Sequence, residues 1–197
     1  MTPEHLVPPE LTARFSEALV YAADAHRSQL RKGTAIPYVS HLLAVAAMVL
    51  EHGGDENEAI AALLHDAIED AGGDSTRQDI RRRFGDEVVA IVDGCTDAET
   101  IPKPPWEERK RAYIAHLAEA GQSVLLVSSA DKLHNARSIL ADYRVIGEEL
   151  WPRFNGGRVG TLWYYRELAN RFSHLRPSKL SAELDRVVTE LEQEAHR

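Results

Sequence analysis

Apolar residues recur every three or four positions along nearly the whole chain, and no alternation of apolar and polar residues lasts more than a few positions. The first such stripe comprises Leu11, Phe15, Ala18, Leu19 and Ala22. This spacing places side chains on one face of an α-helix, whereas a strand needs a period of two. The pattern therefore predicts an all-α fold.

Start and stop signals divide this pattern into helices. Ser40 is expected to cap a helix that the pair Gly53-Gly54 would end. Asp55 and Glu58 have the spacing of a capping box and predict a helix that runs to Gly72-Gly73.

The same signals place the remaining helices. Ser75 and Gln78 repeat the capping-box spacing before a short helix toward Phe84. The apolar run 123–127 could form a short strand, but its position directly before residues 130–135 favours the first turns of a buried helix. Further helices are expected over residues 86–95, 107–120, 124–142, 160–173 and 180–196.

Two stretches interrupt the helical pattern. Residues 31–38 contain a glycine and a proline and are expected to form a loop between the first two helices. Residues 96–106 contain three prolines and form a long connection, which is typical of lids and mobile loops. Because the sequence contains no internal repeat, we expect residues 1–197 to form a single domain.

Composition and charge argue against several classes of partner. The chain has 23 Lys and Arg against 31 Asp and Glu, a net charge of −8, which disfavours binding to nucleic acid or to an anionic membrane. No apolar run approaches the ~20 residues that span a bilayer, and residues 1–5 lack the pattern of a signal peptide. Cys95 is the only cysteine, so neither an internal disulfide nor a cysteine-rich zinc site is expected. We expect a cytoplasmic protein whose oligomeric state the sequence leaves open.

The segment His65-Asp66-Ala67-Ile68-Glu69-Asp70 concentrates ionisable groups directly after an apolar run. On a continuous helix, His65 would lie one turn from Glu69, and Asp66 one turn from Asp70. Burial of carboxylates is unfavourable without a compensating cation, and imidazole with carboxylate suits Mn²⁺, Fe²⁺ or Zn²⁺. The segment therefore predicts a divalent-metal site, with a solvent-facing acidic turn as the alternative.

Two further positions complete the predicted metal site. His41 stands near the start of a helix, and Asp131 follows the apolar run 124–130, where an unpaired acid would be unfavourable. We expect the metal to supply the cation that Asp131 lacks among its neighbours in sequence. His41, His65, Asp66 and Asp131 would then form a four-ligand set that leaves positions for water and substrate.

Four motifs lie in order along the chain. Residues 31–41 contain Arg-Lys, Gly, Pro-Tyr and His, and residues 65–70 read His-Asp-Ala-Ile-Glu-Asp. Residues 84–96 contain Phe-Gly, two valines, Gly and Thr, and residues 130–137 read Ala-Asp-Lys-Leu-His-Asn-Ala-Arg. This series, within residues 18–140, resembles the RelA/SpoT-type alarmone hydrolases, and above all their small single-domain members. These proteins are HD-domain metal-dependent phosphohydrolases.

The resemblance implies an HD-domain helical bundle that helices within residues 150–197 complete. It implies hydrolysis of the 3′-pyrophosphate of guanosine tetra- or pentaphosphate by metal-activated water, with Mn²⁺ as the expected metal. In this family the Glu-Asp pair orients or deprotonates the water, and the matching residues here are Glu69 and Asp70. Leu42 departs from the family, which usually has proline after the histidine, but this change removes no ligand.

Basic and polar side chains near the motifs are candidates for substrate binding. Arg31 and Lys32 could stack on the substrate or contact phosphate from their loop, and Asn135 could bond a ribose hydroxyl or orient a ligand. Around the proline-rich loop, Lys103, Arg109 and Arg111 could reach terminal phosphates. Tyr164 could hold a base or sugar, although aromatic residues at helical spacing more often pack in a core.

Two alternatives to an alarmone hydrolase stay open. An HD-type nucleotidase, or a phosphatase that removes the 2′-phosphate of NADPH, would use the same metal site. A nucleotide-binding sensor without turnover is the other alternative. Such degenerate proteins usually lose ligands or the Glu-Asp pair, and this chain keeps both.

Overall fold

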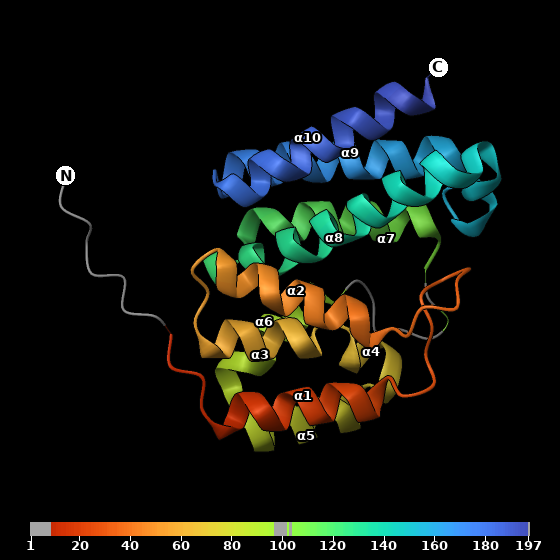
Figure 1. Ribbon diagram of the computed structural model, residues 1–197. Coiled ribbons are helices and arrows are strands. Elements are labelled where there is room, and N and C mark those ends of the chain that lie inside the picture. Colours follow the sequence, from red (N-terminus) through yellow and green to blue (C-terminus); the bar gives the residue numbers. More distant parts are fainter. Residues whose placement is uncertain (1–8, 97–101, 103, 197) are drawn as a thin grey trace.

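The computed structural model describes residues 9–96, 102 and 104–196, and this part of the chain is all-α, as predicted (Figure 1). The helices are α1 Ala13–Ala25, α2 Val39–Glu51, α3 Glu56–Leu64, α4 Ala67–Ala71, α5 Asp74–Phe84, α6 Asp86–Cys95, α7 Trp106–His116, α8 Gln122–Ile146, α9 Gly157–Leu175 and α10 Lys179–Ala195. Short 3₁₀ segments, Leu117–Glu119 and Gly147–Arg153, follow α7 and α8. None of these helices is long and apolar enough to cross a bilayer.

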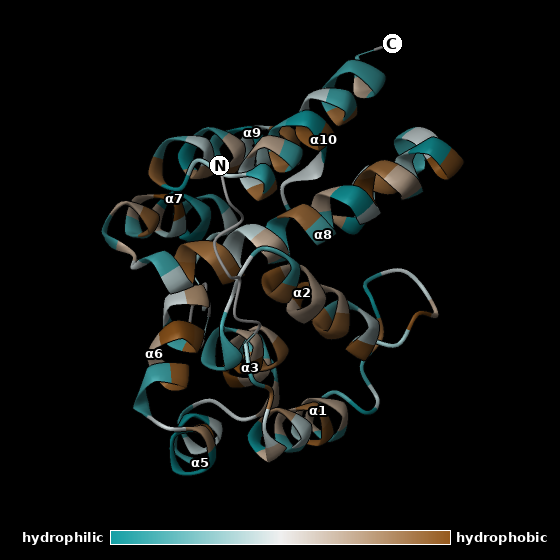
Figure 2. Cartoon of the chain, turned by 60° about the vertical axis from the view of Figure 1, so that its left-hand side comes forward, coloured by the Kyte–Doolittle hydropathy of each residue, from teal (hydrophilic) through white to brown (hydrophobic). Residues whose placement is uncertain are grey.

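The helices are stacked in layers (Figure 1). α9 and α10 pack together above α8, α2 packs between α8 and α3, and α1 packs on the far side of α3. Hydropathy explains this order, since α2 is mostly apolar along its length, whereas α5 at the outer edge is mostly hydrophilic (Figure 2).

Helix α3 lies at the centre because it is apolar on every side. Its start is fixed by the predicted capping box, in which the Asp55 carboxylate accepts from the Glu58 N–H at 2.9 Å and the Glu58 carboxylate accepts from the Asp55 N–H at 2.9 Å. Every residue from 59 to 64 is fully buried. The carboxyl end of α3 therefore delivers the next residues, His65 and Asp66, into the interior.

Helix α8 passes through the middle of the molecule. Residues 125–131 are all buried, and the apolar run that could have been a strand belongs to the first turns of this helix, as predicted. The helix carries Asp131 past the end of α3, next to the start of α2. The metal-ligand candidates therefore come from separate helices that meet in one layer of the stack.

Two predicted helix caps are wrong. Ser40 lies inside α2, where its hydroxyl donates to the Pro37 carbonyl at 2.8 Å, and Tyr38 occupies the cap position. Ser75 lies inside α5, which begins one residue earlier after Gly73, and its hydroxyl donates to the Gly72 carbonyl. In both cases the hydroxyl satisfies a carbonyl of the preceding turn instead of the helix N–H groups.

Candidate active site

A break between α3 and α4 shapes the His65-Asp66 pair. The sequence predicted one continuous helix through residues 65–70, on which these side chains would leave the helix in different directions and could converge on one ion only through their different lengths. Instead α3 ends at Leu64 and α4 begins at Ala67, with His65 and Asp66 in the junction. As a result, His65 Nε2 and Asp66 Oδ2 lie 3.0 Å apart. The break therefore turns adjacent side chains toward one point.

His41 from α2 and Asp131 from α8 join this point. His41 Nε2 lies 3.2 Å from Asp131 Oδ1 and 3.8 Å from Asp66 Oδ2. Asp131 Oδ1 is also 3.7 Å from His65 Nε2. The four residues predicted as metal ligands thus converge from three places in the chain that are far apart in sequence.

The donor atoms fit a divalent cation. His41 Nε2 and His65 Nε2 are buried and have no hydrogen-bond partner, although carboxylate oxygens lie within 4 Å of both. One ligand atom each from His41, His65 and Asp66 can be chosen so that all lie within 4.8 Å of one another. Metal–ligand bonds of about 2.1 Å would place neighbouring ligand atoms about 3 Å apart. A bound cation would satisfy both imidazoles, whose Nε2 atoms have no other partner.

Hydrogen bonds at the far side of each imidazole fix its orientation. His65 Nδ1 lies 2.8 Å from the Ala62 carbonyl and donates to it, so Nε2 is the ring nitrogen left to face the cluster and bind a metal. His41 Nδ1 lies 2.8 Å from His134 Nδ1. If His41 binds a metal through Nε2, its Nδ1 carries the proton and donates a hydrogen bond to His134 Nδ1.

His134 was not predicted to take part in the site. The sequence placed it off the line of Asp131 on α8, yet residues three apart also share a helix face. Its spacing from Asp131 was therefore the available signal. Burial, together with His41 and Arg31, lowers the pKa of His134 to about 4, so the ring is neutral and its Nδ1 can accept a hydrogen bond from His41.

The Asp131 carboxylate also has a partner that contradicts the prediction of no cation nearby in sequence. Lys132 Nζ pairs with Asp131 Oδ2 and lies 5.0 Å from the centre of the Tyr113 ring. Burial opposes the charge on Lys132, but the Asp131 carboxylate raises the pKa of Lys132 well above its usual value. Consecutive side chains of a helix diverge, so this pair could not be predicted from sequence spacing. Lys132 engages Oδ2, whereas the imidazoles face Oδ1.

The charge state of the metal-free cluster follows from its contacts. Burial lowers the pKa of His65, but the Asp66 and Asp131 carboxylates outweigh burial and raise the pKa well above its usual value. Burial prevails at His41 and lowers its pKa. Without metal, one proton on His65 therefore offsets part of the negative charge, and a divalent cation would have to displace it.

Tyr38 anchors the Asp66 carboxylate. Its hydroxyl donates to Asp66 Oδ2 at 2.6 Å, and burial together with the Asp66 charge raises the pKa of Tyr38, which keeps the hydroxyl protonated as a donor. Tyr38 belongs to the Pro-Tyr motif, which is the signal that could have marked it as part of the site.

Glu69 and Asp70 occupy α4, the turn that follows the ligands. Glu69 is half-buried, and Asp70 is exposed with Oδ2 accepting from Gln29 Nε2 at 2.8 Å. Asp70 also lies close enough to Tyr38 for its charge to raise the pKa of that hydroxyl. Both carboxylates therefore lie on the segment that adjoins the cluster.

A cavity of about 400 Å³ adjoins the cluster and is lined by predicted substrate residues Arg31, Lys32 and Asn135. Arg31 Nη2 donates to Asn135 Oδ1 at 2.7 Å, and Asn135 Nδ2 donates to Asp131 Oδ1 at 2.5 Å. A chain of hydrogen bonds thus links the Arg31 loop to a metal-ligand candidate. Asn135 was predicted either to bond a ribose hydroxyl or to orient a metal ligand, and its hydrogen bond to Asp131 agrees with the second alternative.

A second cavity of about 240 Å³ shares Lys32, Phe154 and Tyr165 with the first. Predicted substrate residues Arg109 and Tyr164 line it, together with Lys110. Its described lining contains three cations and no carboxylate, in a chain of net charge −8. The lining also includes Tyr164, which is buried in the core; the core interpretation of this residue is confirmed, and its contact with substrate stays a prediction. Lys103, a further predicted phosphate contact, lies outside the described residues.

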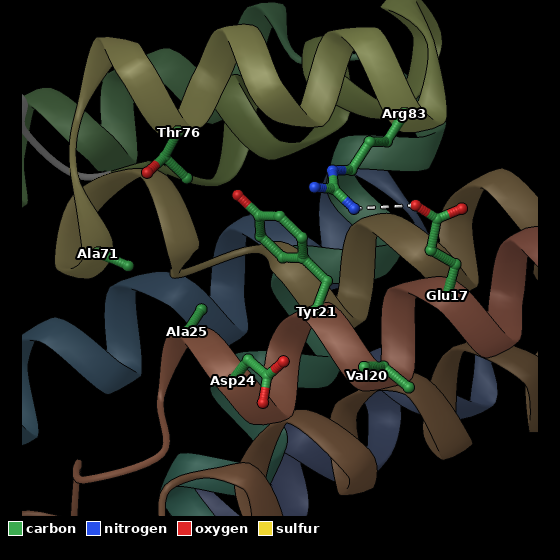
Figure 3. A pocket seen from close by; sticks show the side chains of 8 residues that line it. All are labelled: Glu17, Val20, Tyr21, Asp24, Ala25, Ala71, Thr76 and Arg83. Atoms are coloured by element: carbon green, nitrogen blue, oxygen red, sulfur yellow. Dashed lines mark hydrogen bonds and ion pairs between the residues drawn. The ribbon is translucent and has the colours of Figure 1, made fainter.

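Another cavity, of about 450 Å³, lies between α1 and α5 and ends at Ala71 of α4 (Figure 3). Tyr21 points into it, and an ion pair between Glu17 and Arg83 crosses one side. None of the predicted metal or substrate residues lines it. This cavity is therefore separate from the candidate active site.

The fold and the site together define a helical protein with a buried His-Asp cluster suited to a divalent metal. The chain belongs to the HD domain family, since the model of that family, described as "HD domain", matches residues 18–161. The predicted family resemblance is thereby confirmed.

Similar proteins within this broad family include named hydrolases and a pyrophosphokinase. Guanosine-3′,5′-bis(diphosphate) 3′-pyrophosphohydrolase MESH1 from Xenopus tropicalis is 40% identical over 130 residues, which cover 64% of this chain and 70% of MESH1. The Danio rerio MESH1 is 40% identical over 134 residues, covering 65% of this chain and 70% of that relative. GTP pyrophosphokinase rsh from Brucella melitensis is 36% identical over 191 residues, and this chain spans 25% of its length.

Solved structures agree with these sequences. A structure described as a metazoan ortholog of SpoT that hydrolyzes ppGpp matches with a TM-score of 0.72 and 27% identity, covering 93% of this chain and 96% of that one. The lmo0812 protein of Listeria monocytogenes matches with a TM-score of 0.67 and 31% identity, covering 80% and 99% of the two chains. The similarity therefore extends beyond the motifs to the arrangement of the helices.

Proposed function

We propose that this chain is a metal-dependent hydrolase that removes the 3′-pyrophosphate of guanosine tetra- or pentaphosphate. The observation that carries the proposal is the convergence of His41, His65, Asp66 and Asp131 next to a cavity whose lining includes Arg31 and Lys32. The names of the MESH1 relatives support the substrate, and the HD domain supports hydrolysis. The proposal treats the chain as one domain, located in the cytoplasm.

Mn²⁺ is the metal of this proposal, because imidazole and carboxylate ligands together suit it. Once bound, it would supply Lewis-acid activation of water and of a phosphoryl oxygen. The hydrogen bonds from His65 to the Ala62 carbonyl and from Tyr38 to Asp66 would hold the ligands in place before the metal arrives.

In the reaction, Glu69 and Asp70 orient the attacking water and accept its proton. The water oxygen bonds to the phosphorus attached to the ribose 3′-oxygen, and the bond between that phosphorus and the 3′-oxygen breaks. The 3′-oxygen takes up a proton, so the products are pyrophosphate and GDP or GTP. Each carboxylate needs only to contact the water, which agrees with their place one turn beyond the ligands.

The two cavities divide the recognition of the substrate. Arg31 and Asn135 face the nucleoside portion next to the cluster, with Arg31 offering a planar group for stacking. Lys32, Arg109 and Lys110 neutralise the 5′-phosphates in the second cavity, and Tyr164 forms part of its wall. Lys103 is proposed as a further phosphate contact.

The test is release of phosphate and pyrophosphate by metal-stripped protein with Mn²⁺ added back, on guanosine tetraphosphate, NADPH and common nucleotides. We expect pyrophosphate release from the tetraphosphate only, and only with metal. Release of phosphate from NADPH or other nucleotides instead would assign the chain to broader HD-type nucleotidases. Tight nucleotide and metal binding without turnover would identify a sensor and overturn the proposal.

A further inference from the structure

A chain of hydrogen bonds links the end of α1 to Asp70. His26 Nδ1 lies 2.6 Å from Gln29 Oε1, and Gln29 Nε2 lies 2.8 Å from Asp70 Oδ2. His26 is buried, with 3% of its surface exposed, and its Nε2 has no hydrogen-bond partner. A buried histidine two contacts away from an exposed carboxylate suggests a role for the chain of contacts beyond packing.

The chemistry of the amide fixes the direction of these bonds. A carboxylate only accepts, so the Gln29 amide must turn its NH₂ toward Asp70 and its oxygen toward His26. The oxygen can only accept, so His26 Nδ1 carries a hydrogen and donates. The Asp70 carboxylate therefore fixes the orientation of the Gln29 amide, and the hydrogen bond donated by His26 Nδ1 stabilises that orientation.

The same segment also holds the metal-ligand side of the site. The His26 ring stacks on Tyr38 with centroids 5.2 Å apart and planes inclined by 27°, and Tyr38 donates to Asp66. The Gln29 carbonyl accepts the Tyr38 backbone N–H at 2.9 Å. His26 and Gln29 thus connect the Asp70 carboxylate to the carboxylate of Asp66 through the loop between α1 and α2.

We propose that Gln29, oriented by His26, is a positioning residue that holds the Asp70 carboxylate in register with the metal cluster. This inference rests on the proposed function, in which Asp70 acts on the attacking water. Asp70 is exposed on a helix of five residues, so little else in its described contacts fixes the direction of its side chain. Without the hydrogen bond from Gln29, the Asp70 carboxylate should no longer be held in one position relative to the metal cluster.

The test is the Gln29→Met variant, which keeps the length of the side chain and removes both hydrogen bonds. We expect kcat for guanosine tetraphosphate to fall by about 10- to 100-fold, since misplacing a catalytic group by about 1 Å is enough for such a loss. KM and Mn²⁺ affinity should stay within about twofold, because the substrate cavities and ligands are untouched.

Gln78→Met is the matched control. Gln78 Nε2 donates to Asp74 Oδ2 at 2.8 Å, the same contact at the same distance, on α5 away from the site. It should retain wild-type kcat. Equal activity of the Gln29 and Gln78 variants would overturn the inference, as would a loss in Gln29→Met that appears in KM or in metal affinity. Wild-type protein that fails to hydrolyse the tetraphosphate would instead overturn the proposed function.

A second pair of variants tests the role of His26. Asn offers an N–H near the position of His Nδ1, whereas Leu offers none, so His26→Asn should retain more kcat than His26→Leu at similar thermal stability. A merely structural role predicts that kcat follows stability in both variants. Equal kcat in two variants of equal stability would contradict the proposed orientation of Gln29 by His26.

Discussion

The candidate metal cluster and the two cavities proposed to bind substrate are built in opposite ways. The cluster consists of short side chains in the interior, where His41 is fully buried and the imidazoles of His41 and His65 are each held from behind by a hydrogen bond. The cavities are lined by long cationic side chains, among which Lys32 is exposed and Arg31 and Arg109 are half-buried.

This difference separates two tasks. Buried imidazoles and carboxylates with fixed partners hold one geometry, which suits a cation that tolerates little displacement. Long cationic side chains can follow a flexible polyphosphate, and each contributes a modest share of binding. Changes in the cluster should therefore abolish the chemistry, whereas changes in the cavities should weaken binding by degrees.

The largest effect is expected from Asp66→Asn. The amide keeps the size of the side chain but removes the negative charge, and its NH₂ would face His65 Nε2 at about the position of a metal ligand. We expect Mn²⁺ binding to fall below detection and kcat to fall by roughly 10³-fold or more. Calorimetry with Mn²⁺ and pyrophosphate release measure the two effects.

Asp93→Asn is the control for Asp66→Asn. Asp93 lies on α6 and pairs with Arg77 Nε at 2.8 Å, outside the cluster. It should bind Mn²⁺ and turn over substrate as wild type does. If Asp66→Asn also bound Mn²⁺ normally, the cluster would not be the metal site. The proposed division of tasks between the cluster and the cavities would then be wrong.

The sequence predicted three of the four cluster positions because each one violates a local rule, whereas His41 was proposed from its place near a helix start. Asp131 follows a run of apolar residues, and His65 and Asp66 follow a helix that is apolar on every side, so these groups need a buried partner. The helix break that turns His65 toward Asp66 was not predicted, since residues 64–68 contain neither glycine nor proline. Tertiary contacts around α2 and α8 outweigh local helix propensity there.

Neighbours of the cluster were harder to predict for a different reason. Lys132 and His134 share α8 with Asp131, and their contacts depend on side-chain directions and on how closely α2 approaches α8. The fold itself was predictable, because helical periodicity runs through the chain. The errors at Ser40 and Ser75 arose because each helix begins one or more residues earlier, so that each hydroxyl bonds a carbonyl of the preceding turn.

A smaller effect is expected from Arg31→Met, which tests the cavity next to the cluster. The change removes the bond to Asn135 and the cation at the cavity wall while keeping the aliphatic stem. We expect KM for guanosine tetraphosphate to rise roughly 10- to 100-fold, since bonds to charged groups contribute about 1.5–3 kcal/mol. Steady-state kinetics and Mn²⁺ titration would check this; a loss of Mn²⁺ affinity comparable to Asp66→Asn would contradict the separation of tasks.

A still smaller effect is expected from Arg109→Met in the second cavity. Partial exposure screens its charge, so KM should rise only about three- to tenfold, and a substrate without 5′-phosphates should show no change. Arg111, which the sequence also offered as a phosphate contact, is exposed on the same helix, pairs with Glu107 at 2.8 Å and does not line this cavity, so Arg111→Met is the matched control. If Arg109→Met and Arg111→Met changed KM equally, or if Arg109→Met changed KM equally for both substrates, the 5′-phosphates would not bind in this cavity.

The smallest effect concerns stability at the edge of the cluster. His134 has its pKa lowered to about 4 by burial, His41 and Arg31, so the folded protein keeps this ring neutral. Between pH 6.5 and 4 the unfolded chain binds a proton at this position that the folded protein does not bind. The contribution of neutral His134 to folding is therefore present above pH 6.5 and is lost as pH falls toward 4.

Replacement of His134 by Asn removes this titration while keeping a polar side chain beside His41. Urea unfolding of the metal-free proteins should show that wild type loses about 2 kcal/mol more than His134→Asn between pH 7 and pH 4.5, because a pKa difference of one unit corresponds to about 1.4 kcal/mol. His41 titrates in both proteins, so comparison at each pH isolates His134. Parallel stability curves would mean that His134 is not held neutral in the fold. In that case His41 Nδ1 and His134 Nδ1 would both carry a hydrogen and could not form a hydrogen bond. His41 would then lack the contact that holds its ring, and the cluster would be less rigid than proposed here.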